Sequence, residues 1–110
     1  MTVEHQKAPA AMPNDTDLTY LSAAEQGNLI KRRAISPVDL VRTCLDRIDR
    51  YDSVFRAYIT VCKEHALAAA RQAEREISAG NYRGPLHGIP FGVKDQLYSK
   101  DIRTTLGSRV

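Results

Sequence analysis

The sequence predicts an α/β fold in which N-terminal helices lead into the start of a sheet. Aromatic and β-branched residues predominate at positions 55–61, which is typical of a strand. The stretch 64–79 is then rich in alanine and charged helix formers, and a glycine-rich turn leads to a second short strand over 91–95. The order strand, helix, turn, strand is a βαβ unit, so the two strands should be parallel with a right-handed crossover.

Composition indicates one small, soluble, cytoplasmic domain. The chain has 110 residues, 43% of them hydrophobic and 26% charged, as in ordinary globular proteins. The net charge of +3 is scattered and forms no basic block, so charge does not support direct contact with nucleic acid. Two cysteines are too few for a disulfide framework. No apolar run approaches the roughly 20 residues of a membrane span, so no membrane association is expected.

The N-terminal region should be a tail followed by a helix. Residues 1–17 lack periodicity and are expected to be disordered or loosely docked. Ser22 and Glu25 form a capping-box pattern that predicts a helix from about Ala23 to Arg32. Gly27 inside this helix costs about 1 kcal/mol relative to alanine, so the helix should be the weakest.

Stronger signals mark the next two helices. Ser36 as N-cap and Pro37 at the first helical position open one helix, which 52–53 should break. Its apolar stripe is Val38, Val41, Leu45 and Ile48. The helix over 64–79 carries a seam of small residues that allows close packing, and Gly80 or Asn81 should end it. The seam is Ala66, Ala70, Ala73 and Ile77.

The run from Gly84 to Asp95 reads GPLHGIPFGVKD and combines turn chemistry with a strand. Alternation along that strand places Gly92 and Lys94 on one face and Asp95 on the other. Asp95 should therefore not pair with Lys94, and Gly92 leaves open space beside it. His87 lies within the turn and is interpreted as a turn residue, not a catalyst.

Together with Thr104-Thr105-Leu106-Gly107-Ser108, this run resembles the amidase signature family. The resemblance extends from about residue 18 to the end, and implies that 18–110 is the N-terminal part of an amidase signature domain. The implied fold is a mixed sheet covered by helices, of which this chain holds the beginning.

The implied activity is hydrolysis or transfer at a carboxamide by two serines and a lysine. Lys94 matches the family's lysine, the general base of the triad. A lysine works as a base only when it is neutral, which needs its pKa lowered from about 10.4 by roughly three units. Burial on the Gly92 face would provide such an environment. The glycine- and serine-rich segment that holds the family's serines does not occur in this sequence, so the 110-residue chain alone should be inactive.

Five further residues match positions expected to support the active site: Asp95, Thr104, Thr105, Gly107 and Ser108. Asp95 is expected to act as a structural hydrogen-bond acceptor. Asp101 departs from the glycine that is often found there in the family. No cofactor is implied and no metal is expected, because Cys62 and His65 supply only two ligands.

The expected substrate is a small amide. The resemblance also leaves open the A-subunit of a transfer-RNA-dependent amidotransferase. A different class of function is a short non-catalytic interaction module derived from this fold. The sequence also leaves a homo-oligomer open.

Overall fold

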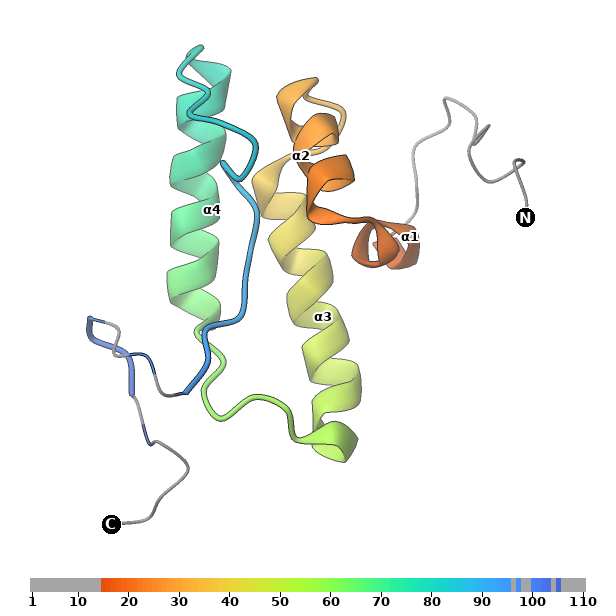
Figure 1. Ribbon diagram of the computed structural model, residues 1–110, viewed down its shortest axis with the longest axis vertical. Helices are drawn as coiled ribbons and strands as arrows, with labels where there is room; N and C mark the ends of the chain where they lie inside the picture. The colour runs from red at the N-terminus through yellow and green to blue at the C-terminus, as the bar shows by residue number, and fades with distance from the viewer. Residues whose placement is uncertain (1–14, 96, 98–99, 104, 106–110) are drawn as a thin grey trace.

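A computed structural model describes residues 15–95, 97, 100–103 and 105. This part of the chain forms α1 (Asp15–Tyr20), α2 (Ala23–Lys31), α3 (Pro37–Phe55) and α4 (Lys63–Ser78). Helices α3 and α4 pack along each other, and the chain after α4 turns back past α2 and runs along this pair (Figure 1). None of the described helices is both long and apolar enough to cross a membrane.

The prediction of strands over 55–61 and 91–95 is wrong for the described part of the chain, which contains no strand. Phe55 is the last residue of α3, and residues 56–62 and 89–94 have no regular structure. Strands are stabilised by pairing with neighbours, and no described segment pairs with these two. Their apolar side chains are accordingly open to solvent, with Phe55 74% and Phe91 84% exposed.

The first two helices confirm one prediction and add an element. Helix α1 begins at Asp15, inside the segment expected to be a tail, and residues 1–14 lie outside the described residues. The capping box of α2 is confirmed, since Ser22 Oγ accepts from the Glu25 N–H at 3.1 Å. The Ser22 N–H in turn donates to Glu25 Oε1 at 2.9 Å, and this hydrogen bond lowers the pKa of Glu25.

Helix α3 starts as predicted but ends later. Ser36 Oγ accepts from the Asp39 N–H at 3.0 Å, and Pro37 is the first helical residue. The predicted break at 52–53 is wrong, because Asp52 stabilises the end of the helix instead of interrupting it. Its carboxylate accepts from the N–H groups of Ala57 at 2.7 Å and Tyr58 at 3.2 Å, just beyond the helix. Local sequence does not distinguish this capping role from a helix break, since aspartate favours both.

Helix α4 confirms the small-residue seam and its stop. Ala70, Ala73 and Ile77 are buried, and the Val38, Val41 and Leu45 stripe of α3 is buried with Ala70 in one cluster. Gly80 has φ of 90°, and the Asn81 N–H bonds to the Glu76 carbonyl at 2.8 Å. A glycine in the left-handed conformation, followed by this backbone hydrogen bond, is a usual C-terminal cap of an α-helix.

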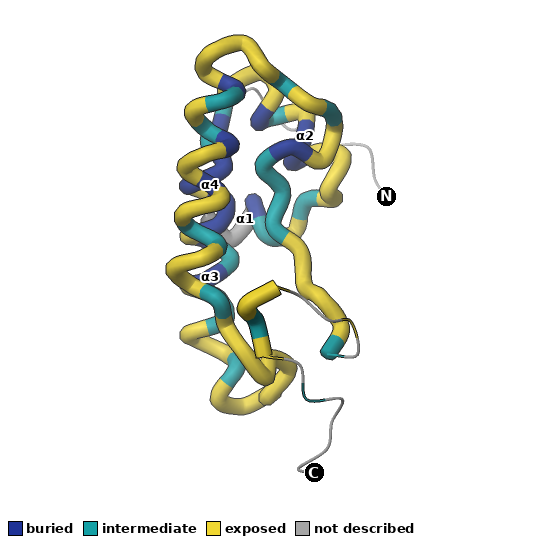
Figure 2. The backbone as a smooth tube through the Cα atoms, turned by 90° about the vertical axis from the view of Figure 1, so that its left-hand side faces the viewer, coloured by how far each residue is buried: buried dark blue, intermediate teal, exposed yellow. Residues whose placement is uncertain are grey.

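A second core cluster joins α2 to the end of α4. It contains Leu18, Ile30, Ile35, Leu40 and Ile77, with Tyr82 and Ile89 packed against it. Nη2 of Arg33 donates to the carbonyls of Ile77 and Ser78, both at 3.0 Å. Figure 2 shows burial concentrated among the helices and the turn after α4, whereas residues 91–94 are exposed.

Candidate functional site

The predicted turn at the start of the GPLHGIPFGVKD run is confirmed. Gly84 has φ of 138° and Gly88 has φ of 88°, values that glycine adopts without steric cost. The His87 N–H bonds to the Gly84 carbonyl at 3.0 Å, and the Ile89 N–H bonds to the Leu86 carbonyl at 3.1 Å. The glycines therefore fold residues 84–89 into a compact double turn.

This turn is packed tightly against two helices. A Cβ added at Gly27 of α2 would lie 2.5 Å from the Pro85 carbonyl oxygen. A Cβ added at Gly88 would lie 2.7 Å from Cγ of Pro37, at the start of α3. Gly27 was predicted only to weaken its helix. The structure shows that the absence of a side chain at Gly27 lets the backbone of the turn approach α2 closely.

His87 is the most buried side chain of the turn, at 4% exposure. Its Nδ1 accepts from the Arg83 N–H at 3.0 Å, and its Nε2 lies 2.9 Å from Oε1 of Glu76 on α4. The sequence placed His87 in a turn but gave no signal for this contact, because Glu76 carries no motif and is brought there by packing.

Glu76 collects polar partners from α4 and from the turn. Nε2 of Gln72 donates to its Oε2 at 3.1 Å, and Nη2 of Arg83 lies 2.8 Å from its Oε1. The Gln72 hydrogen bond contributes most to lowering the pKa of Glu76 below its ordinary value of 4.5. Partial burial opposes this shift, and His87 and Arg83 lower the pKa further.

The lowered pKa predicts a specific acid sensitivity. The unfolded chain binds a proton at Glu76 more readily than the folded chain, so stability should fall as pH drops from about 4.5 through the lower folded pKa. In Glu76→Gln this part of the pH dependence should be missing. Urea unfolding at pH 7 and at successive acidic values would test it, and parallel pH profiles of both proteins would contradict it.

Lys94 is exposed in this chain, so the expected burial on the Gly92 face is not found among the described residues. The expected open space is present, since a Cβ added at Gly92 would meet nothing within 4 Å. No ion pair of Lys94 occurs in the described part of the chain, so Asp95 is not its partner there. The assignment of Lys94 as a general base stays a prediction.

Asp95 is joined to the second part of the motif. Its Oδ1 accepts from the Thr105 N–H at 2.8 Å, and its Oδ2 accepts from the Thr105 hydroxyl. The chain after Lys94 therefore folds back, and Thr105 is held beside the residue that follows the lysine. Thr104, Gly107 and Ser108 lie outside the described residues.

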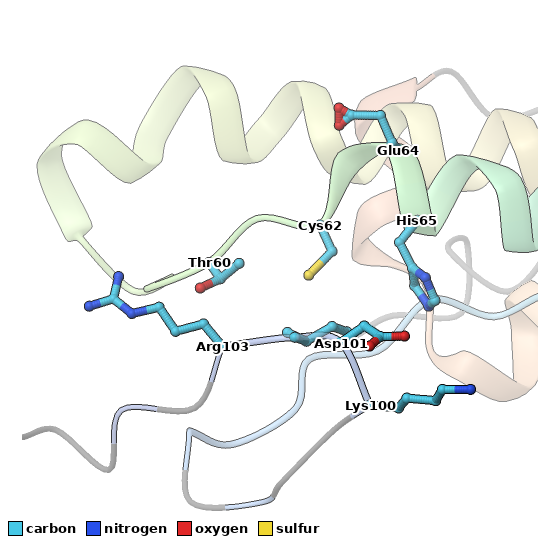
Figure 3. A pocket seen from close by; sticks show the side chains of 8 residues that line it. Thr60, Cys62, Glu64, His65, Lys100, Asp101 and Arg103 are labelled. Carbon is cyan, nitrogen blue, oxygen red and sulfur yellow. The ribbon is translucent and has the colours of Figure 1, made fainter.

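A hollow lies beside this region but does not include Lys94. Its volume is about 540 Å³, and Cys62 and His65 point into it toward the 100–103 segment (Figure 3). It is lined by Thr60, Cys62, Glu64, His65, Lys100, Asp101, Ile102 and Arg103. No group of three or more metal-ligating side chains occurs among the described residues. Asp101 has φ of 60°, a left-handed conformation that favours glycine.

Comparison with known proteins gives consistent matches. The family model described as Amidase matches residues 39–110. A glutamyl-tRNA(Gln) amidotransferase A-subunit of Dehalococcoides mccartyi is 45% identical over 95 residues, which are 86% of this chain and 19% of the relative. A protein of Mycobacterium tuberculosis named as the amidase AmiD is 36% identical over 110 residues, 100% of this chain and 23% of the relative. The chain thus spans about a fifth of the length of these curated relatives. No solved structure matches it.

Proposed function

The chain belongs to the amidase family, and on that premise we propose that it is the N-terminal part of a hydrolase that cleaves carboxamide C–N bonds. One observation carries the proposal: Thr105 donates two hydrogen bonds to Asp95, next to Lys94. These bonds join the two sequence motifs of the family in space. An active site requires residues from separate motifs to lie close together, so this contact supports a site around Lys94 that both motifs share.

In the proposed mechanism, neutral Lys94 is the general base. It removes a proton, through a relay serine, from the serine whose oxygen attacks the amide carbonyl. The amine leaves with a proton, and water then hydrolyses the acyl-enzyme. Both serines would come from the part of the relatives that this chain does not cover. The same part would cover Lys94, which is exposed here and needs shielding from water to act as a base.

The experiment is an amidase assay on the complete polypeptide that contains this segment. Release of ammonia from small aliphatic and aryl carboxamides should be measured, with the 110-residue chain as the matched control. We expect hydrolysis by the complete polypeptide and none by the 110-residue chain. A complete polypeptide that hydrolyses no carboxamide would contradict the proposal.

The 45% identity to the amidotransferase relative supports a second candidate. The complete protein would then transfer ammonia to glutamyl-tRNA(Gln) together with partner proteins, and would release little ammonia from small amides alone. The AmiD relative aligns over all 110 residues and the amidotransferase relative over 95, which favours the hydrolase. Glutamine-dependent amidation of glutamyl-tRNA(Gln), measured with and without the partner proteins, distinguishes the two. We place either protein in the cytoplasm.

A further inference from the structure

We infer that His87 is a positioning residue for Lys94. As a neutral imidazole with its proton on Nε2, it ties the 84–89 turn to α4 and so fixes where the Lys94 segment leaves the helices. The role in positioning rests on the proposed function of Lys94, whereas the tautomer of the imidazole follows from the hydrogen-bond geometry.

The hydrogen bonds of the ring determine its protonation. The Arg83 backbone N–H can only donate, so Nδ1, at 3.0 Å, must accept and carries no proton. In a neutral ring the single proton is then on Nε2, which donates to Glu76 Oε1 at 2.9 Å. A proton on Nδ1 would place two N–H donors against each other, so the observed geometry requires this one tautomer.

The acceptor on α4 is itself held in place. Oε2 of Glu76 accepts a hydrogen bond from Gln72, and Oε1 pairs with the Arg83 guanidinium. The carboxylate therefore cannot rotate away without breaking both interactions. Arg83 therefore makes two contacts: its backbone N–H donates to His87, and its guanidinium pairs with Glu76. Arg83, just before the turn, and His87, within it, are thereby fixed relative to one turn of α4.

The turn is the last firmly packed part of the chain before Lys94. Ile89 packs on the core, and the residues from Phe91 to Lys94 are exposed and without regular structure. The direction in which the chain leaves the turn therefore sets where the segment that leads to Lys94 begins. His87 itself is buried, and both of its ring nitrogens are bonded within the protein, to Arg83 and Glu76, so we infer that it acts through the chain and not on the substrate.

Nitrogen NMR of the labelled 110-residue chain tests the tautomer. The side-chain signals of His87 should show an unprotonated Nδ1 and a protonated Nε2. His65 is exposed on α4 and serves as the internal reference, for which we expect averaged tautomers. A proton on Nδ1 of His87, or averaging like that of His65, would overturn the inference.

Kinetics of the complete enzyme test the positioning role with two variants. His87→Asn keeps a short acceptor for the Arg83 N–H but cannot reach Glu76, whereas the longer amide of His87→Gln can donate to Glu76. We expect His87→Asn to lower kcat about 10–100-fold with little change in KM, because a small displacement of a catalytic group is costly. His87→Gln should recover part of this loss, and His65→Gln should match the unmodified enzyme.

Equal kcat in His87→Asn and the unmodified enzyme would overturn the positioning role. So would a loss confined to KM, which indicates substrate contact. Activity retained after loss of the Lys94 amine would instead overturn the proposed function and leave the NMR result standing. If His87→Asn does not fold, the comparison of His87→Gln with His65→Gln decides, because equal kcat in that pair would also remove the role.

Discussion

Replacing Lys94 with alanine in the complete enzyme should lower kcat/KM for amide hydrolysis by about 10²–10⁴-fold, the usual contribution of a general base. The side chain is exposed and makes no ion pair in the described part of the chain, so its removal should not change the fold. The loss would therefore report on chemistry. Initial rates of ammonia release, with circular dichroism as a check on folding, measure it.

Lys94→Arg separates the role of a base from that of a positive charge. Arginine keeps the charge and most of the length but stays protonated in proteins, so it cannot accept the proton. We expect this variant to be as inactive as Lys94→Ala. Lys100→Ala, an exposed lysine further along the same segment, is the matched control and should retain activity. Full activity in Lys94→Arg would make the lysine a charge contact, and full activity in both Lys94 variants would favour a non-catalytic interaction module.

Local chemistry explains why the helix starts were predictable. Ser22 with Glu25, and Ser36 with Pro37, satisfy the free N–H groups of a helix start within a few residues of themselves. Gly80 and Gly88 were predictable as turn positions for a similar reason, since a positive φ is a property of a single residue. Motifs whose partners are neighbours in sequence could thus be assigned from the sequence.

Features that depend on distant partners could not be assigned in this way. The residues at 55–61 have strand propensity, but propensity yields a strand only where another strand pairs with it. The contact between His87 and Glu76 and the approach of Pro85 to Gly27 arise only after the turn packs against α4 and α2. For the candidate site, the sequence indicated Lys94, Asp95 and Thr105, whereas only the structure showed how Asp95 is bonded and what holds the turn.

Glycine-to-alanine substitutions provide the second prediction with a large expected effect. Four glycines differ in two independent properties, a positive φ and a close neighbour at the position of an added Cβ. Gly88 has both a positive φ and a close neighbour, Gly80 has only the positive φ, Gly27 has only the close neighbour, and Gly92 has neither. Gly88→Ala should therefore lower the free energy of unfolding most, by about 2–5 kcal/mol from backbone strain and overpacking together. Gly80→Ala should cost about 1–2 kcal/mol from strain alone.

Gly27→Ala should have an intermediate effect. Overpacking against the Pro85 carbonyl costs about 1–3 kcal/mol, and alanine returns about 1 kcal/mol of helix propensity. Gly92→Ala is the matched control and should stay within about 0.5 kcal/mol. Urea denaturation of the 110-residue chain measures all four. If Gly88→Ala costs no more than Gly80→Ala, the turn is not held against Pro37, and the path by which His87 would fix Lys94 loses one of its supports.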